Sequence, residues 1–186
     1  MTLATTTIPG YLAGTWSIDP THSDISFSVR HMMVSKVKGR FGSFSGTIVT
    51  GATPAQSSVT AEIDLNSIDT NNAQRDNHIR SADFFEVEKY PTMTFRSTSV
   101  DSDGEDYLVT GDLNLKGITK SVTLKLELNG IGPDAYGGTR AGFSASTEIS
   151  RKEFGVDIDM PMDGGGVVIG DKISIALEIE AVLDAA

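Results

Sequence analysis

Apolar and polar residues alternate at every second position in several stretches of the chain. The clearest examples are residues 25–29, 122–128 and 173–181, where Ile, Phe, Val or Leu alternates with residues that are mostly polar. A strand with one buried and one solvated face produces this period of two, which is typical of antiparallel sheets. Weaker alternation predicts further strands over residues 59–65, 93–95, 113–115, 143–149 and 156–160.

Glycine-containing turns separate these predicted strands. Asp103-Gly104 and Lys116-Gly117 each lie between two of them, and Asn129-Gly130 and the stretch Gly132–Gly138 follow Leu128. Because positive φ costs little at Gly and Asn, such dipeptides favour tight turns. Regularly spaced strands with these turns indicate a sandwich or a barrel. A barrel of about eight strands has an interior that either fills with side chains or holds one small ligand, and the periodicity leaves both possibilities open.

Two stretches depart from the strand pattern. Asp69-Thr70 is a candidate N-cap for a short helix over residues 71–80, in which Asp76 and Arg80 are i,i+4 partners. The helix has a poor composition, so we expect packing to hold it in place. We expect the second stretch, His31–Lys38, to form a helical turn over one end of the sheet.

Length and charge narrow the class of protein. The 186 residues predict one domain over residues 14–186, preceded by a flexible, Thr-rich arm over residues 1–13. A formal charge of -10 and a pI near 4.6 argue against binding to nucleic acid and against docking on anionic lipid. The absence of Cys excludes disulfides, thiol nucleophiles and thiolate metal sites.

No targeting signal is visible in the opening residues. They carry no basic n-region and no apolar run of signal-peptide length, and no window approaches the roughly 18 apolar residues of a membrane span. We therefore expect a cytoplasmic protein with no stable membrane insertion.

The three histidines do not suggest a metal site. His31 shares parity with Phe27 and Val29, so it is expected to point inward at a strand end, whereas His22 has the opposite parity. A catalytic zinc site needs three converging ligands, and no such spacing is present. We expect no metal, and we expect His22 to be a capping or core-edge residue bonded to the backbone.

Charged residues gather on the predicted helix. Arg75, Asp76, His78 and Arg80 lie within six positions. They form either a structural ion-pair network or, if the helix plugs a barrel end, a site for the polar head of a molecule whose apolar tail lies in the barrel. Arg151 continues the parity of residues 143–149, so it is expected to point inward, paired with a nearby Asp or Glu or in contact with a ligand.

Diagnostic catalytic motifs are absent. The chain has no GxSxG, no P-loop and no GxGxxG before a helix. Aromatic residues such as Phe27, Phe41, Phe44 and Phe95 could line a cavity or simply fill a core. We therefore expect a protein that is not an enzyme.

Taken in order, a series of short motifs resembles the YceI-like family, the lipocalin-like polyisoprenoid-binding proteins. The most specific part is the helical segment and its flanks, in which Arg75-Asp76-x-His78-Ile79-Arg80 is followed by Asp83-Phe84-Phe85. The matches extend from about Thr15 to Leu183. The other matching segments are Trp16–Ser23, Phe27-x-Val29-x-His31, Gly39–Gly46, Ser67–Thr70, Tyr90–Phe95, Gly111–Lys120, Arg151–Gly155 and Gly170-Asp171.

This resemblance implies a mainly β fold, an extended eight-stranded antiparallel lipocalin-like barrel with a short helix near one end. It also implies an elongated apolar cavity for a long isoprenoid or isoprenoid-quinone-like lipid, held for carriage, storage or sequestration without another cofactor. Many relatives carry a signal peptide, and this chain departs from them there. Candidate residues for the ligand head group at the mouth are His31, Arg75, Asp76, His78 and Arg151. Candidate lining residues are Phe27, Val29, Phe41, Phe44, Met93, Phe95 and Phe143.

Two other functions remain open at this stage. One is an enzyme that acts on an isoprenoid lipid through the His/Arg/Asp cluster, and the other is a structural barrel with a solid core. A homodimer is also possible.

Overall fold

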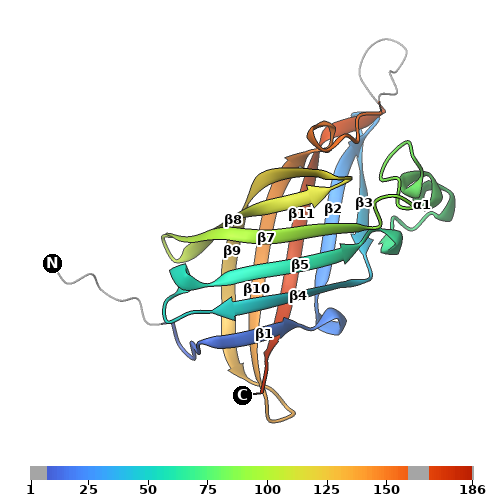
Figure 1. Ribbon diagram of the computed structural model, residues 1–186. Coiled ribbons are helices and arrows are strands. Elements are labelled where there is room, and N and C mark those ends of the chain that lie inside the picture. Colours follow the sequence, from blue (N-terminus) through green and yellow to red (C-terminus); the bar gives the residue numbers. More distant parts are fainter. Residues whose placement is uncertain (1–7, 159–167, 186) are drawn as a thin grey trace.

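The chain forms one antiparallel sheet that closes on itself in a computed structural model, which describes residues 8–158 and 168–185 (Figure 1). Its strands are β1 (Gly14–Ile18), β2 (Asp24–His31), β3 (Ser35–Phe41), β4 (Phe44–Thr50), β5 (Ser58–Asp64), β6 (Ile68–Asp69), β7 (Thr92–Asp103), β8 (Asp106–Leu115), β9 (Ile118–Pro133), β10 (Thr139–Ser150) and β11 (Ile169–Leu183). They follow the order β1-β4-β5-β7-β8-β9-β10-β11-β2-β3-β6. Because β1 also pairs with β11, the sheet closes into a barrel.

Six of the short strands are halves of three bent strands. The 3-10 turn η1 (Pro20–His22) separates β1 from β2, and both halves pair with β11. Gly42-Ser43 separates β3 from β4, and the 3-10 turn η3 (Leu65–Ser67) separates β5 from β6. Counted in this way, the described residues form an eight-stranded antiparallel barrel, as the resemblance implied.

The alternation of side chains places the core inside this barrel. A large cluster of buried apolar side chains includes Phe41, Met93 and Phe95, and a smaller one surrounds Trp16. The Trp16 side chain is almost fully buried, and its indole N–H donates a 2.9 Å hydrogen bond to Thr50 Oγ1. The buried indole therefore leaves no polar atom unpaired.

The predicted turn at Asn129-Gly130 is wrong. These residues lie inside β9, where the pairing with β10 shifts register between Gly142 and Phe143. One extra residue at this point makes an irregularity in the strand, as in a β-bulge. The chain reverses over residues 134–138, within the glycine-containing stretch Gly132–Gly138 that was also predicted as a turn. The turns at Asp103-Gly104 and Lys116-Gly117 are confirmed.

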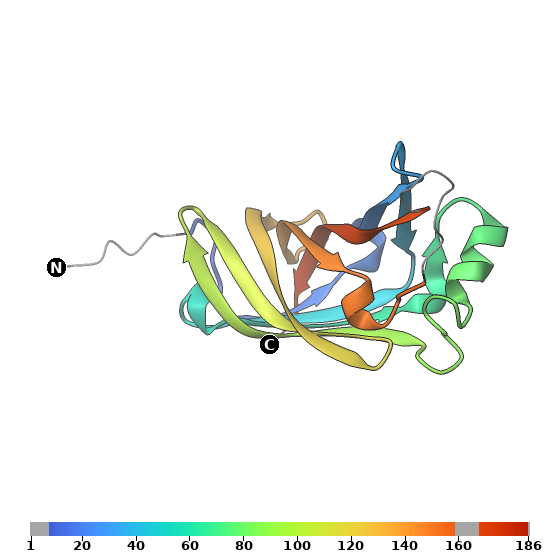
Figure 2. The same cartoon turned by 90° about the horizontal axis from the view of Figure 1, so that it is seen from above.

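The single α-helix of the described residues, α1 (Ala73–Arg80), lies beyond one end of the barrel (Figure 2). Its N-cap is Asn72, not Asp69-Thr70, because the Asn72 side chain accepts the Arg75 backbone N–H at 2.9 Å. The predicted Asp76–Arg80 pair is also wrong, since Arg80 donates to the carbonyls of Asn66 and Ile68 instead. No helix in the described ranges is long and apolar enough to cross a membrane.

A β-hairpin occupies the segment that was expected to be a helical turn. β2 and β3 pair from Ile25↔Phe41 to His31↔Ser35, and only residues 32–34 form the turn between them. Met32 and Met33 both have positive φ, at 51° and 61°. The prediction missed this hairpin because neither residue is the Asn or Gly that usually marks such a turn.

Two further predictions fall partly outside the described residues. Of the expected arm over residues 1–13, the structure describes residues 8–13, where the Tyr11 hydroxyl donates to the Gly51 carbonyl and Leu12 accepts from Thr50 Oγ1, both at 2.7 Å. Residues 1–7 lie outside the description. Residues 156–158, expected as a strand or extended loop, form no strand, and Met160 lies outside the description.

Candidate functional site

The barrel interior is hollow at the end near α1. A cavity of about 280 Å³ opens there among mainly apolar side chains. The barrel contributes Ile25, Phe27, Val29, Val37, Phe41, Met93, Leu115, Ile149, Ile173 and Ile175, and the segment around α1 contributes Ile79, Phe84 and Phe85. The alternative of a solid core, which the sequence left open, does not hold at this end of the barrel.

A second apolar cavity of about 130 Å³ lies deeper in the barrel. Ile25, Met93 and Ile175 line both cavities, so the two adjoin. Beyond the second cavity, the smaller core cluster around Trp16 and Ala181 fills the interior. The interior therefore holds two adjoining apolar cavities, and the buried side chains of the smaller core cluster lie beyond the second one.

All seven predicted lining residues border these cavities. Phe27, Val29 and Phe41 line the first cavity, Met93 lines both, and the second cavity takes the remaining three, Phe44, Phe95 and Phe143. Their contact with a ligand stays a prediction.

Two glycines leave room for the rings of Phe27 and Phe95 against the barrel wall. A Cβ on Gly39 would lie 2.4 Å from the Phe27 ring, and one on Gly111 would lie 2.5 Å from the Phe95 ring. Each ring therefore lies against bare backbone on a neighbouring strand, which keeps it close to the barrel wall. A glycine inside a strand pattern is the sequence signal for such a close approach.

The mouth of the first cavity is basic. Arg30, His31, Arg75, His78 and Arg151 line it, and no acidic side chain is found among the described residues that line this cavity. In a chain of charge -10, this is a local reversal of sign. Sequence reasoning missed Arg30, because its parity places it on the outer face of β2.

Arg75 reaches the cavity from the first turns of α1. Its Nε donates to Thr70 Oγ1 at 2.8 Å and its Nη2 donates to the Thr70 carbonyl at 2.6 Å. His78, on the same helix, contacts the cavity while its Nε2 lies 2.9 Å from Asp83 Oδ2 and its ring meets Phe84 edge-on. Both side chains are held in position and still present part of their surface to the interior.

Asp76 does not face the cavity. It is 7% exposed, and its Oδ1 accepts hydrogen bonds from the backbone N–H of Thr70 at 2.9 Å and from the Thr70 hydroxyl. The prediction that Asp76 lies at the mouth is therefore wrong. Its carboxylate instead fastens α1 to the end of β6.

Arg151 points inward, as its parity predicted, but its expected acidic partner is absent from the described residues. The side chain is 4% exposed, and its guanidinium donates to four backbone carbonyls. The acceptors, at 2.8 to 3.2 Å, are Val156, Ile158, Ile169 and Gly170. The buried guanidinium is thus held by backbone carbonyls beside an apolar cavity.

Asp171 lies near this arginine without pairing with it. Burial alone would raise the Asp171 pKa, but hydrogen bonds from the Ser150 hydroxyl and the Lys152 backbone N–H, together with the charge of Arg151, lower it overall. Asp171 therefore stays ionised and ties β11 to the residues that follow β10.

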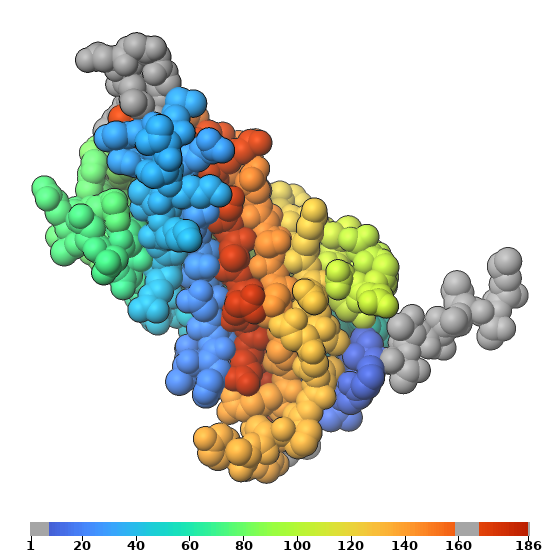
Figure 3. Space-filling model, turned by 180° about the vertical axis from the view of Figure 1, so that it is seen from behind, coloured from blue at the N-terminus to red at the C-terminus, as the bar shows by residue number. Residues whose placement is uncertain are grey.

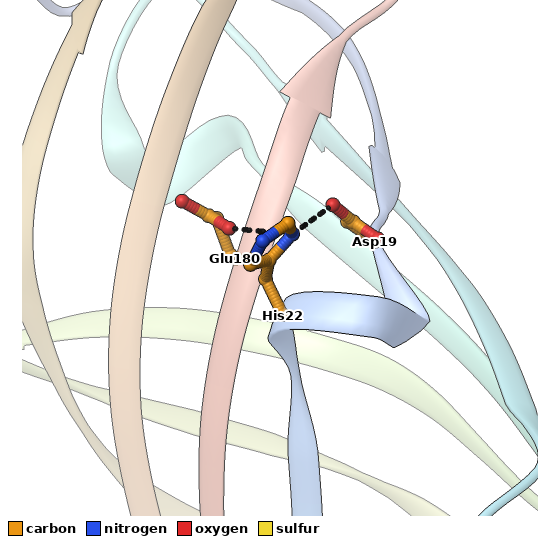
Figure 4. A group of neighbouring side chains, drawn as sticks. All are labelled: Asp19, His22 and Glu180. Atoms are coloured by element: carbon orange, nitrogen blue, oxygen red, sulfur yellow. Dashed lines mark hydrogen bonds and ion pairs between the residues drawn. The ribbon is translucent and has the colours of Figure 1, made fainter. Parts of the chain in front are cut away.

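A second polar cluster lies at the opposite end of the barrel. The His22 ring contacts carboxylates of Asp19 at 2.7 Å and Glu180 at 3.4 Å (Figure 4). His22 was expected to be a capping or core-edge residue bonded to the backbone. Its backbone N–H donates to the Asp19 carbonyl at 3.3 Å, whereas its ring bonds to carboxylates and not to the backbone. Arg140 donates to the same two carboxylates, at 2.8 and 3.3 Å, and to Asp134 at 3.0 Å.

This second cluster is a salt-bridge network and not a convincing metal site. Asp19, His22 and Glu180 could each offer a ligand atom, but a guanidinium already occupies the space between the carboxylates. The hydrogen bond from Arg140 is the largest cause that holds the Asp19 pKa well below its usual range, and the bond to Asp19 likewise raises the Arg140 pKa. The network joins β1 and η1 to β10 and β11.

Comparisons with known proteins agree with this architecture. A family model described as "YceI-like domain" matches residues 16–181. Protein YceI of Escherichia coli is 46% identical over 140 residues, which cover 75% of this chain and 73% of that protein. The crystal structure of BcnA from Burkholderia cenocepacia is similar with a TM-score of 0.75 at 25% identity, over 88% of this chain and 98% of that one.

A polyisoprenoid binding domain from Saccharophagus degradans shares the fold at lower identity. The TM-score is 0.70 at 20% identity, over 93% of this chain and all of that domain. With the family model spanning most of the barrel and a relative at 46% identity, the chain belongs to the YceI-like family.

Proposed function

We propose that the protein binds a long-chain isoprenoid lipid inside the barrel, for carriage, storage or sequestration. The observation that carries this proposal is the pair of adjoining apolar cavities, which together run from a basic mouth to a filled far end. The fold is shared with the polyisoprenoid binding domain from Saccharophagus degradans. A quinone with an isoprenoid tail belongs to the same class of ligand.

The energetics favour a long tail. Each buried CH₂ contributes about 0.8 kcal/mol, whereas association costs roughly 4–15 kcal/mol in lost motional freedom. A ligand with only a few methylene groups would not offset that cost. An apolar chain that occupies both cavities would, and the cavity walls would select for length and apolarity.

The head group is proposed to lie at the basic mouth. Arg75, His78 and His31 present hydrogen-bond donors there, and Arg151 adds a buried positive charge. These groups suit a head with carbonyl, hydroxyl or anionic oxygen atoms. The tail then extends toward the second cavity.

The enzymatic alternative has less support. It relied on a His/Arg/Asp cluster at the mouth, and Asp76 is turned away from it to bond with Thr70. The remaining donors at the mouth can bind a head group without any reaction.

Native mass spectrometry of the purified protein, followed by organic extraction, tests the proposal. We expect a bound lipid, and we expect protein stripped of it to rebind a long prenyl alcohol or quinone. Phe27→Arg places an unpaired charge in the apolar wall and should abolish rebinding. Ser174→Arg, on an exposed outward position of β11, is the matched control. Stripped wild-type protein that binds no prenyl compound would refute the proposal.

Replacing both Arg75 and His78 by Ala tests the placement of the head group. We expect weaker binding of a ligand with a polar head and little change for a prenyl hydrocarbon that lacks one. Equal affinities of the variant and the wild-type protein for the polar ligand would refute this placement.

A further inference from the structure

The β2–β3 hairpin carries a positive charge that the rest of the chain does not share. Between Asp24 and Glu62 the sequence has no acidic residue, yet it has Arg30, Lys36, Lys38 and Arg40. All four side chains are exposed, and the three on β3 alternate with residues that face inward, so they share its outer face. Figure 3 shows β2 and β3 as a continuous surface beside β11.

These charges are not neutralised within the fold. Arg30 lies directly opposite Lys36 in the strand register, a like-charge pair that by itself destabilises a hairpin. Among the described residues, the ion pair of this group is a loose one, Arg40 with Asp69 at 3.9 Å, and Arg30, Lys36 and Lys38 have none. The hairpin therefore retains its charge for a partner outside the molecule.

The tip of the hairpin is apolar and exposed. Met32, Met33 and Val34 are 44%, 57% and 88% exposed. In Figure 2 the hairpin projects beyond the barrel at the end that also carries α1. An apolar tip above a basic stem is the arrangement by which peripheral proteins bind anionic membranes, since the tip enters the interfacial region while Lys and Arg meet the head groups.

We infer that this hairpin docks the protein reversibly on an anionic lipid surface. The whole-chain charge predicted the opposite, but that average does not describe the hairpin. Val29, Arg30 and His31 of the same hairpin line the first cavity, so a docked tip would place the cavity mouth next to the lipid. The docking itself does not require the proposed isoprenoid ligand, and the two proposals can fail separately.

Vesicle flotation tests this inference. We expect the wild-type protein to bind vesicles of phosphatidylcholine mixed with phosphatidylglycerol, to ignore phosphatidylcholine alone, and to dissociate at high salt. The double variant Lys36→Glu, Lys38→Glu should weaken binding by roughly tenfold or more. The matched control is Lys120→Glu with Lys125→Glu, which makes the same change of net charge at exposed positions of β9.

A tryptophan at the tip supplies a second measurement. The only native tryptophan, Trp16, is buried, so the emission of Val34→Trp should shift to the blue when anionic vesicles are added. Tyr136→Trp, at an exposed site near the opposite end of the barrel, should not shift.

Three results would overturn the inference: no vesicle binding by the wild-type protein, equal losses in the two charge-reversed pairs, or a blue shift at position 136 but not at 34. Because Lys36 and Lys38 do not line the cavity, the hairpin variant should bind a detergent-solubilised prenyl alcohol as the wild-type protein does. Vesicle binding without any prenyl binding would refute the proposed function and leave the docking surface standing.

Discussion

Filling the second cavity with a larger side chain should convert the protein to one that prefers shorter ligands. Ala145 lines this cavity from β10 and is itself buried. Ala145→Leu adds three carbon groups to a space of about 130 Å³, so the side chain displaces a similar length of ligand tail. Three displaced groups at about 0.8 kcal/mol each amount to roughly 2.4 kcal/mol, which corresponds to about a 50-fold higher Kd.

The effect should depend on the length of the ligand. A short prenyl alcohol that occupies only the first cavity should bind the variant and the wild-type protein equally, whereas a long one should show the full loss. Calorimetric titration of stripped protein with both alcohols, which share one head group, measures this difference. Ser146→Leu places the same side chain one residue away, at an exposed position of β10, and should change neither affinity.

Equal losses for the short and the long ligand would show that the Ala145→Leu substitution distorts the whole barrel. No loss for either would show that the tail does not reach the second cavity. The second result would refute the proposed orientation, with the head at the basic mouth and the tail toward Trp16. A thermal melt of the unliganded variant separates these cases, because a side chain that fills an existing cavity should not lower Tm.

Three further substitutions test the barrel wall, the attachment of α1 and the salt-bridge network. Gly39→Ala should force the Phe27 ring away from the barrel wall. We expect the free energy of unfolding, measured by urea titration, to fall by about 1–3 kcal/mol and the long alcohol to bind more weakly. An unchanged free energy of unfolding together with an unchanged affinity would contradict the close contact between Gly39 and Phe27. Asp76→Ala should cost about 1–3 kcal/mol by leaving the Thr70 N–H without its acceptor, and an unchanged urea midpoint would show that α1 is held by other contacts. The salt-bridge network should make the stability of the protein depend on pH. Because the Asp19 pKa is lowered in the folded state, the stabilisation from Asp19 is complete well above the unfolded pKa of about 3.9 and is lost as the pH falls below that value. Asp19→Asn should therefore flatten the decline in Tm between neutral and acidic pH, and an identical decline in the two proteins would refute this assignment.

The period of two predicted most of the barrel because it reports a local property. Alternation at residues such as Phe27 and Val29 depends only on which face of a strand is buried, and both residues line the first cavity. The family resemblance supplied the number of strands. Neither one supplied the bends at η1 and η3, where one strand becomes two.

Predictions about polar side chains were less successful because their partners are distant or belong to the backbone. Asp76 faces Thr70 because of the way α1 docks on β6, a tertiary arrangement that helical spacing does not contain. The Arg151 guanidinium donates hydrogen bonds to four backbone carbonyls. Because every residue has a backbone carbonyl, the sequence does not show which ones accept these bonds. His22 meets Glu180, which is 158 residues further along the chain.

The net charge of the whole chain is a poor predictor of lipid binding for a related reason. A charge of -10 is a correct description of the protein in bulk, and it was used to argue against anionic lipid. Attraction to a surface falls off within a Debye length of about 8–10 Å, so a partner responds to the charges nearest to it and not to the total. The fold gathers basic residues on the outer face of one hairpin and around one cavity mouth, and both lie at the same end of the barrel. A lipid surface that approaches the hairpin therefore meets Arg30, Lys36 and Lys38, which carry positive charge although the whole chain is acidic.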